Sequence, residues 1–420
     1  MSAIIYWLAI QLYAIVVRIA ALFNPKARSF IAGREGLLST IRYALVNERR
    51  PRIWIHCASV GEFEQGRPLI VQLREKYPNY AFVLTFFSPS GYELRKDYEG
   101  VDYVFYMPFD GLYNAKKFVK MVKPELAIFV KYELWYFYLR QLAKRGVPTI
   151  LASAIFRKKQ LFFKWYGVLH RRMLHVFEHI FVQDVGSLHL LNSVNIDNVS
   201  VSGDTRFDRV INANKQIEFS HDIIESFTAD HKVIVAGSTW PADERLLKEV
   251  VSKLPRKWRI ILVPHEVHDA HIEYIETLFK GNTIRWTEWE TRADKDKQVL
   301  IVDKMGLLLK LYQFADVAWI GGGVGKTGLH NTLEAAVFGK PIIHGENFSK
   351  FKEAKDLIEL NASFAVRKAT EVIDLLDHWE KDTAAYSLAC KNAHSYVLSN
   401  AGATATIMDH IAAKKLLTVS

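Results

Sequence analysis

The chain has 420 residues, of which 50% are hydrophobic and 24% charged, and this ordinary globular composition excludes an intrinsically disordered protein. An excess of 55 Lys and Arg over 45 Asp and Glu gives a formal charge of +10, which favours an anionic partner such as nucleic acid, a phospholipid surface or a phosphorylated substrate. Two cysteines, Cys57 and Cys390, exclude a disulfide-dense secreted scaffold and a four-thiolate metal site, so a reducing compartment fits best.

Residues 1–23 predict a membrane-anchor helix. From Ala3 to Phe23 the chain is almost wholly apolar, with Arg18 as its only charged residue, and such a helix roughly matches the thickness of a hydrocarbon core. The next basic residues follow this stretch, whereas those of a secretory signal precede it. The positive-inside rule then keeps the bulk of the chain in the cytoplasm. An apolar helix docked on the rest of the protein is the alternative.

Short runs rich in β-branched and aromatic residues alternate with amphipathic stretches from residue 53 onward. The strands predicted in the first half are Ile53–Cys57, Ala81–Phe86, Val101–Tyr106, Leu126–Val130, Thr149–Ala152 and His179–Gln183. Helix-length segments such as residues 66–77 and 113–122 lie between them. This alternation predicts a parallel sheet covered on both faces.

The same pattern begins again after a polar stretch near residues 204–225. The strands predicted there are Lys232–Ala236, Arg259–Val263, Val299–Val302, Asp316–Ile320 and Pro341–His344. The sequence therefore predicts an α/β fold with two doubly wound domains, residues 35–205 and 225–395, and a C-terminal helix over residues 396–420. In this architecture ligands bind where the carboxyl ends of both sheets face a shared cleft.

A glycine-rich segment, residues 321–328, follows a predicted strand and precedes a predicted helix. Backbone amides and a helix N-terminus can hold a phosphate at such a place. Ile320 stands where a Walker A loop needs glycine, but the spacing over residues 323–328 satisfies the dinucleotide fingerprint G-x-G-x-x-G, with Glu346 about where a ribose-binding acid would sit. Glycines that only permit a tight turn are the alternative.

Residues 330–341 (HNTLEAAVFGKP) predict a short helix with Gly339 as its stop signal. Glu334 is positioned to bind vicinal ribose hydroxyls while the helix N-terminus faces a phosphate. Alternatively, Asn331 caps the helix and Glu334 completes a capping box. The two roles are compatible.

The segment Ser59-Val60-Gly61-Glu62 follows the first predicted strand of the N-terminal domain. It places Glu62 at the carboxyl edge of the sheet and in the first turn of a helix, where the helix dipole favours an ionised carboxylate that can act as a general base. The spacing of Ser59 and Glu62 also fits a capping box, which is the structural alternative.

Residues 157–172 (RKKQLFFKWYGVLHRR) contain six cations and no acid, interleaved with aromatic residues. Together with the apolar N-terminus this pattern favours a headgroup interface or contact with a phosphorylated lipid. Single-stranded nucleic acid and an ordinary helix with a core-facing aromatic stripe are the alternatives. The cations assigned to phosphate contact are Lys158, Lys159, Arg171 and Arg172.

Three histidines, His265, His268 and His271, recur at three-residue spacing. Residue 269 is Asp, so this is not the H-E-x-x-H zinc motif. We expect these histidines to face solvent or substrate and we expect no metal site.

Four segments occur in order along the chain: residues 58–62 (ASVGE), 132–135 (YELW), 237–239 (GST) and 330–341. Their combination resembles the 3-deoxy-D-manno-oct-2-ulosonic acid (Kdo) transferases of lipopolysaccharide biosynthesis, glycosyltransferase family 30, over almost the whole chain. The resemblance implies a GT-B glycosyltransferase that inverts the anomeric centre, with CMP-Kdo as donor and a lipid A precursor (lipid IVA) as acceptor. It implies no metal and no other cofactor.

The resemblance also implies site residues, with the acceptor on the N-terminal domain and the nucleotide sugar on the C-terminal domain. Glu62 is the expected general base. The remaining acceptor residues, besides the four cations above, are Ser59, Gly61 and Glu133. The expected donor residues are Ser238, Thr239, Arg206, Gly323, Gly325, Lys326, Thr327, Gly328, Asn331 and Glu334.

The chain departs from the family pattern at three positions. Lys131 and Tyr136 stand where the family commonly has an acid and a proline, so only Glu133 remains of an acidic pair. His265 replaces an arginine expected near the donor phosphate.

The predicted location is the cytoplasmic face of the cell inner membrane. We expect an anionic membrane surface as a partner and we expect no nucleic acid partner. Three other functions compete with Kdo transfer. They are a GT-B transferase that uses a UDP-sugar, an NAD-dependent oxidoreductase based on the residue 323–328 fingerprint, and a nucleic-acid-binding protein based on the positive charge.

Overall fold

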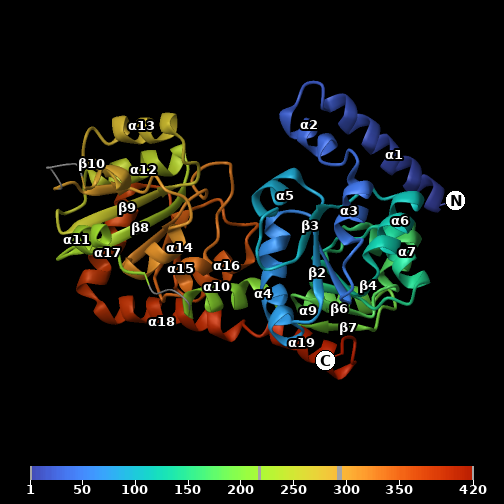
Figure 1. Cartoon of the computed structure of the whole chain (residues 1–420). Helices are drawn as coiled ribbons and strands as arrows, with labels where there is room; N and C mark the ends of the chain where they lie inside the picture. Colours follow the sequence, from blue (N-terminus) through green and yellow to red (C-terminus); the bar gives the residue numbers. More distant parts are fainter. Residues whose placement is uncertain (1, 216–218, 291–295, 419–420) are drawn as a thin grey trace. The chain divides into compact units, whose positions relative to one another are not determined.

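The computed structural model describes residues 2–215, 219–290 and 296–418. The chain divides into two compact units (Figure 1), which comprise residues 1–209 with 401–420, and residues 210–400. Each unit is built on one seven-stranded sheet, and all the strand pairs in both sheets are parallel. The predicted α/β fold with two parallel sheets is therefore confirmed.

The sheet of the first unit has the strand order β3-β2-β1-β4-β5-β6-β7. Its strands are β1 (Arg52–Cys57), β2 (Ala81–Phe86), β3 (Tyr103–Tyr106), β4 (Pro124–Val130), β5 (Thr149–Ala154), β6 (His179–Val182) and β7 (Val199–Val201). The order reverses between the paired strands β1 and β4, and doubly wound sheets bind ligands at the carboxyl ends of strands at such a switch point.

Strand β1 is buried along its whole length because helices cover both faces of the sheet. Ile53 packs in one hydrophobic cluster with Leu69 and Ile407, while Trp54 packs in another with Phe118 and Tyr138. The sheet helices are α4 (Val60–Lys76), α5 (Pro89–Arg95), α6 (Leu112–Val122), α7 (Tyr136–Lys144), α8 (Val168–Leu174), α9 (Val185–Asn192) and α19 (Ala403–Ala413), with a 3-10 turn, η1, at Leu161–Phe163. Burial on both faces explains why the parallel strands read as continuous apolar runs.

The C-terminal residues form two helices instead of the single helix predicted over residues 396–420. Helix α18 (Thr383–Ser399) ends before Gly402, whose φ of +107° lies in the left-handed region that favours glycine. Helix α19 then begins, and the Asp208 carboxylate accepts hydrogen bonds from the amides of Gly402 and Thr404. This break returns the chain to the first unit, where α19 completes one face of the sheet.

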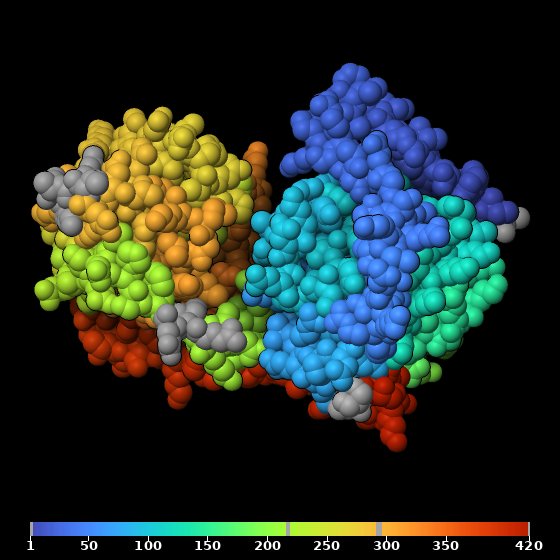
Figure 2. Space-filling model, viewed as in Figure 1, coloured from blue at the N-terminus to red at the C-terminus, as the bar shows by residue number. Residues whose placement is uncertain are grey.

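The first three helices are α1 (Ser2–Ala20), α2 (Pro25–Ala32) and α3 (Leu37–Leu45). Figure 2 shows α1 and α2, in dark blue, as a ridge that projects from the rest of the first unit. Helix α1 contains one window, Ala3–Ala20, that is long and apolar enough to cross a membrane. Its large apolar side chains that are at least half exposed are Ile4, Ile5, Leu8, Leu12, Ile15, Val16 and Ile19.

The sheet of the second unit has the order β10-β11-β9-β8-β12-β13-β14 and reverses between β8 and β12. Its strands are β8 (Lys232–Thr239), β9 (Trp258–Pro264), β10 (Thr283–Arg285), β11 (Val299–Ile301), β12 (Val317–Ile320), β13 (Ile342–Gly345) and β14 (Ser363–Val366). Its other elements are α11 (Asp222–Thr228), α12 (Pro241–Val251), α13 (Asp269–Leu278), η2 (Trp286–Glu288), α14 (Leu308–Leu311), η3 (Tyr312–Phe314), α15 (Leu333–Ala336), α16 (Lys352–Glu359) and α17 (Ala369–Lys381). Helix α10 (Thr205–Lys215) runs through the boundary between the two units.

Candidate functional site

Glu62 lies at the switch point of the first sheet, where β1 passes into α4. Glu62 belongs to the first turn of α4 and is 8% exposed. The Ser59 hydroxyl donates a hydrogen bond to the Glu62 carboxylate, but the Ser59 side chain makes no hydrogen bond to the helix backbone. The capping-box alternative is therefore wrong, because the Ser59 side chain does not cap the helix backbone. The contact with Ser59 instead holds the Glu62 carboxylate at the sheet edge, where the positive end of the helix dipole favours negative charge.

Glu133 follows β4, the strand beside β1. Its Oε2 accepts a hydrogen bond of 2.9 Å from Trp135 Nε1 and lies 3.7 Å from Nε2 of His56. The Cys57 thiol, fully buried at the end of β1, has its pKa raised first by burial and then by the negative charges of Glu62 and Glu133. Two carboxylates thus flank the switch point, and Gly61, next to Glu62 in the first turn of α4, is exposed.

An aromatic path joins the N-terminal helices to Glu133. Ring centroids are separated by 6.4 Å between Tyr13 and Phe30, by 5.2 Å between Phe30 and Phe87, and by 4.6 Å between Phe87 and Trp135. Residues from α1 and α2 therefore pack directly against the carboxyl edge of the sheet. The apolar N-terminus therefore contributes side chains to the surroundings of this edge.

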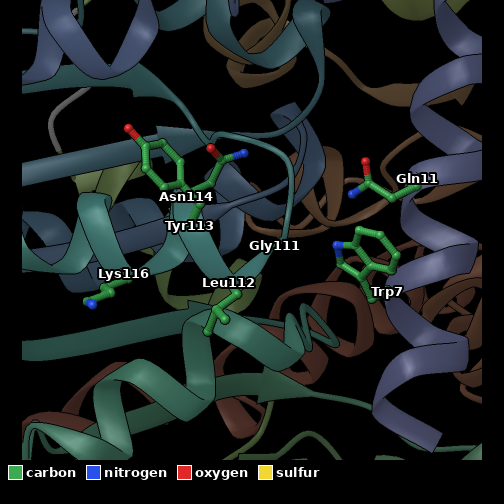
Figure 3. A pocket seen from close by; sticks show the side chains of 7 residues that line it. All are labelled: Trp7, Gln11, Gly111, Leu112, Tyr113, Asn114 and Lys116. Atoms are coloured by element: carbon green, nitrogen blue, oxygen red, sulfur yellow. The ribbon is translucent and has the colours of Figure 1, made fainter. Parts of the chain in front are cut away.

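Helix α1 also lines a cavity of about 460 Å³ with the beginning of α6 (Figure 3). Trp7 and Gln11 project from α1 toward the α6 side, where Leu112 and Tyr113 provide apolar surface and Lys116 provides a cation. The exposed apolar face of α1 thus continues into a groove with a basic residue at its margin.

The basic segment 157–172 is largely a loop with the 3-10 turn η1, and α-helix begins only at residue 168, so the ordinary-helix alternative is wrong for most of it. Lys158, Lys159 and Arg172 are exposed, as expected for phosphate contact. Arg171 instead donates hydrogen bonds to the carbonyl oxygens of Phe162 and Lys164, so it braces the loop. The loop presents two further side chains to solvent, Trp165 (88% exposed) and Tyr166 (58% exposed).

Ser238 and Thr239 end β8 at the switch point of the second sheet. Ser238 is half-buried, but Thr239 is fully buried and its hydroxyl donates to Oε1 of Glu244 at 3.1 Å. The other Glu244 oxygen lies 3.0 Å from Nε2 of His271. Thr239 therefore supports the strand end from inside, and His271 is a buried partner of Glu244 instead of the solvent- or substrate-facing residue predicted.

The glycine-rich segment crosses between two strand ends at very close range. A Cβ on Gly321 would collide with the carbonyl of Ser238, and one on Gly323 would collide with the backbone of Gly345. The Gly322 amide donates to the buried Asp243 carboxylate at 2.8 Å. The glycines thus permit backbone packing, and at least one of the amides expected to hold phosphate is already occupied.

No long helix follows this segment, because α15 begins only at Leu333 and has four residues. The geometry that a dinucleotide fingerprint requires, a glycine turn that opens directly into a helix, is absent from residues 321–336, all of which the structure describes. The remaining predicted loop residues are Gly325 and Gly328, which are half-buried, and Lys326 and Thr327, which are exposed.

Asn331 and Glu334 contact each other, but Asn331 is not the N-cap that the capping alternative predicts. Asn331 Oδ1 accepts from the Leu333 amide at 3.1 Å, and Asn331 Nδ2 donates to Glu334 Oε1 at 3.1 Å. The N-cap of α15 is Thr332, whose side chain makes no capping hydrogen bond, so Asn331 supports the start of the helix from the residue before the cap. The ribose role of Glu334 stays a prediction, compatible with this contact because a carboxylate accepts several hydrogen bonds.

Trp240, His265 and His330 form a ring cluster beside the loop. Trp240 Nε1 donates to His330 Nε2 at 2.9 Å, and His265 stacks 4.5 Å from His330 and 4.7 Å from Trp240. An indole N–H can only donate, so His330 carries its proton on Nδ1. Burial lowers the pKa of His330 to about 4, assisted by His265, which keeps the ring neutral at pH 7.

Arg206 lies in the first unit, whereas the other predicted donor residues lie in the second. Its guanidinium pairs with the Asp204 carboxylate at 2.7 Å, and Gln65 of α4 donates to the other Asp204 oxygen at 3.2 Å. The structure therefore groups Arg206 with the α4 side of the first sheet.

Sequence analysis missed His56, Trp135, Asp243, Trp240 and His330 as members of these sites. Each stands within a recognised motif or within four residues of one, so closeness to a motif was the available signal. The described residues contain no group of three or more His, Cys, Asp and Glu side chains that could hold a metal ion. The expectation that transfer needs no metal stays a prediction.

Comparison with known proteins confirms the resemblance drawn from the motifs. A family model described as 3-deoxy-D-manno-octulosonic-acid transferase (kdotransferase) matches residues 34–209. The chain is 27% identical to a 3-deoxy-D-manno-octulosonic acid transferase of Haemophilus influenzae, over 84% of this chain and 83% of that protein. It is also 27% identical to the enzyme of the same name from Chlamydophila psittaci, over 80% of this chain and 79% of that protein.

Solved structures support the fold alone. A UDP-GlcNAc 2-epimerase from Neisseria meningitidis, bound to UDP-GlcNAc, superposes with a TM-score of 0.62 over 85% of this chain and 98% of that chain, at 14% identity. A putative UDP-N-acetylglucosamine 2-epimerase from Listeria monocytogenes gives a TM-score of 0.57 over 88% of this chain and 98% of that chain, at 11% identity. Both likenesses agree with the predicted GT-B arrangement of two parallel α/β sheets.

Proposed function

We propose that this chain, a glycosyltransferase of the Kdo transferase family, transfers Kdo from CMP-Kdo to a lipid A precursor of the lipid IVA type and inverts the anomeric centre. The observation that carries the proposal is the similarity to Kdo transferases over more than four fifths of the chain, with Glu62 buried at the switch point of the first sheet.

The chemistry assigned to the first unit is proton removal. A hydroxyl of the acceptor attacks the anomeric carbon of Kdo on the face opposite CMP, a new carbon–oxygen bond forms, and the bond to the CMP phosphate breaks. The hydroxyl proton passes to Glu62, and the leaving phosphate takes the bonding electron pair. A positioned carboxylate is worth about 10²- to 10⁴-fold in rate for such a step.

The second unit is assigned to the nucleotide sugar. A departing phosphate gains negative charge and needs fixed donors around it, and this unit offers the exposed Lys326, the Nδ1–H of His330 and the loop around Thr327. Glu334 lies in the first turn of α15, where it is assigned to the ribose hydroxyls. Asp243 holds the loop through the Gly322 amide, and Thr239 supports the end of β8 through Glu244.

The proposed location is the cytoplasmic face of the inner membrane. The exposed apolar face of α1 supplies partition energy, and cations near an anionic surface add about 1 kcal/mol each. The loop with Trp165 and Tyr166, flanked by Lys158 and Lys159, supplies the second signal that stable anchoring needs. The acceptor, itself a phosphorylated lipid, is then presented at headgroup depth.

A product assay tests the proposal. The purified full chain is incubated with a tetraacylated lipid A precursor and with CMP-Kdo, CMP alone or a UDP-sugar. The mass of the lipid product is then measured by mass spectrometry. We expect a mass increase of one or more Kdo residues only with CMP-Kdo. Transfer from a UDP-sugar, or no transfer from CMP-Kdo by folded protein, would overturn the assignment.

A further inference from the structure

His56, in the middle of the first sheet, has a ring nitrogen whose role the proposed chemistry does not yet explain. The residue is 0% exposed, and its Nδ1 lies 2.9 Å from the hydroxyl oxygen of Thr85. Its Nε2 is buried and has no hydrogen-bond partner within the described part of the chain, although Glu133 Oε2 lies 3.7 Å away. A buried polar atom without a partner is costly, so it calls for an explanation.

The neighbours of His56 indicate which ring nitrogen carries the proton. Trp54 Nε1 donates to the Thr85 hydroxyl oxygen at 2.9 Å, so the proton of that hydroxyl goes to His56 Nδ1 at 2.9 Å or to the Ile55 carbonyl at 3.5 Å. We assign it to the shorter contact, which makes Nδ1 an acceptor and places the ring proton on Nε2. This tautomer directs an N–H, and not a lone pair, at the Glu133 carboxylate.

The Glu133 carboxylate is held at one oxygen and open at the other. Oε2 receives the hydrogen bond from Trp135 and faces the Nε2–H of His56. For Oε1, the described residues provide no hydrogen-bond donor, and the side chain keeps 14% exposure. The free oxygen lies at the same switch point as Glu62.

We propose that His56 is a positioning residue for acceptor binding. With Trp135 it fixes Oε2 of Glu133, so that Oε1 accepts a hydrogen bond from an acceptor-sugar hydroxyl beside the attacking one. Catalytic hydrogen bonds are often long without substrate and tighten in the complex, and the 3.7 Å contact shortens when the acceptor binds. One carboxylate, Glu62, then takes the proton, and the other orients the sugar. This inference rests on the proposed function, which supplies the acceptor.

Two amide variants test the two ring nitrogens separately. The side-chain amide of His56→Gln reaches the place of Nε2 and keeps a donor for Glu133, whereas that of His56→Asn reaches the place of Nδ1 and keeps only the Thr85 contact. We expect His56→Gln to retain kcat/KM for the acceptor within a few fold and His56→Asn to lose about 10- to 100-fold, the scale of a misplaced positioning group. Trp135→Phe, which removes the other donor, should resemble His56→Asn.

The controls separate positioning from a general loss of structure. The melting temperatures of the two His56 variants are compared, and their CMP affinity is measured by calorimetry. Both variants should bind CMP as the wild type does, because every predicted donor residue except Arg206 lies in the second unit. Equal activity of the Gln and Asn variants, or higher activity of the Asn variant at equal melting temperature, would refute the positioning role.

A second readout does not depend on turnover. Nitrogen-15 spectra of histidine-labelled protein, with the His56 signals assigned by their loss in His56→Gln, should show the proton on Nε2. A proton on Nδ1 would overturn the inference. If the wild type fails to transfer Kdo, only the proposed function is refuted. The role of His56 is then decided by its tautomer and by the binding of a tetraacylated lipid A precursor to the two variants.

Discussion

Asp110 ties the N-terminal helix to the carboxyl edge of the first sheet, and its ionisation predicts how the stability of the first unit depends on pH. The residue is 1% exposed. Its Oδ2 accepts from the Tyr6 hydroxyl of α1 at 2.7 Å and from the amide of Phe137 at 3.1 Å, while Oδ1 accepts from the amide of Tyr138 at 3.3 Å. It therefore caps α7 and holds α1 at the same time.

Burial raises the pKa of Asp110 from 3.8 to about 6, although its three hydrogen bonds oppose the shift. A folded-state pKa above the unfolded one means that the folded protein binds the proton more tightly. The resulting stabilisation is fully present below about pH 4 and is lost as the pH rises through about 6. Two pKa units correspond to about 3 kcal/mol.

The assay compares wild type with Asp110→Asn, which keeps the shape but does not titrate. The free energy of unfolding of the first unit is measured by urea titration between pH 4 and 8, with hydrogen exchange at the Phe137 and Tyr138 amides as a local probe. Relative to the variant, the wild type should lose about 3 kcal/mol between pH 4 and 7 and then stay level. A constant difference over this range, or a wild type that gains stability as pH rises, would refute the reasoning.

Tyr6→Phe supplies the matched control, because it removes one donor without touching the carboxyl group. Above pH 7 the tyrosine donates to a charged acceptor, a bond worth about 1.5–3 kcal/mol. Below pH 4 the acceptor is neutral and the bond is worth about 1 kcal/mol. The cost of Tyr6→Phe should therefore grow with pH, and α1 should become easier to detach from the protein when this bond is absent.

Three further predictions concern the proposed reaction. Glu62→Gln keeps an acceptor for the Ser59 hydroxyl, so it should fold normally, bind CMP normally and lose about 10²- to 10⁴-fold in turnover; near-normal turnover would remove Glu62 from the mechanism. Glu334→Gln should weaken CMP binding in calorimetry and leave lipid acceptor binding unchanged, and an unchanged CMP affinity would reject the ribose contact. Deletion of α1 should release the protein from anionic vesicles at high salt more readily than at low salt, and further neutralisation of Lys158, Lys159 and Arg172 should abolish sedimentation with vesicles; persistent sedimentation would place the attachment elsewhere.

Much of the fold could be predicted because parallel strands buried on both faces leave continuous apolar runs in the sequence. The strands that prediction missed, β7, β10 and β14, have three or four residues, and β7 is only partly buried. Such short edge strands carry little hydrophobic signal. The break before α19 was missed for another reason: Gly402 alone marks it, and the stabilising carboxylate of Asp208 is distant in sequence.

The part of the candidate site that depends on residues next to strand ends could be predicted from the sequence. Glu62 and Glu133 follow two strands that turned out to be neighbours, so the rule for carboxyl edges was enough to bring them together. Their supports could not be found in this way, because the partner of His56 is Thr85 on another strand, and Asp110, which caps α7, is separated from it in sequence by helix α6 and strand β4. Contacts of that kind leave no periodicity in the sequence.

The two switch points show why spacing alone does not separate a cap from a catalytic group. Asp243 lies three residues after Trp240, is fully buried and uses one carboxylate oxygen to accept from the amides of Trp240 and Gly322, so the backbone holds it in a place that solvent does not reach. Glu62 lies three residues after Ser59 and accepts from a side-chain hydroxyl, a contact that can rotate away at little cost to the fold. The same acid-at-position-three pattern thus serves structure in the second unit and leaves a carboxylate available for chemistry in the first. What distinguishes the two is the kind of donor each carboxylate faces.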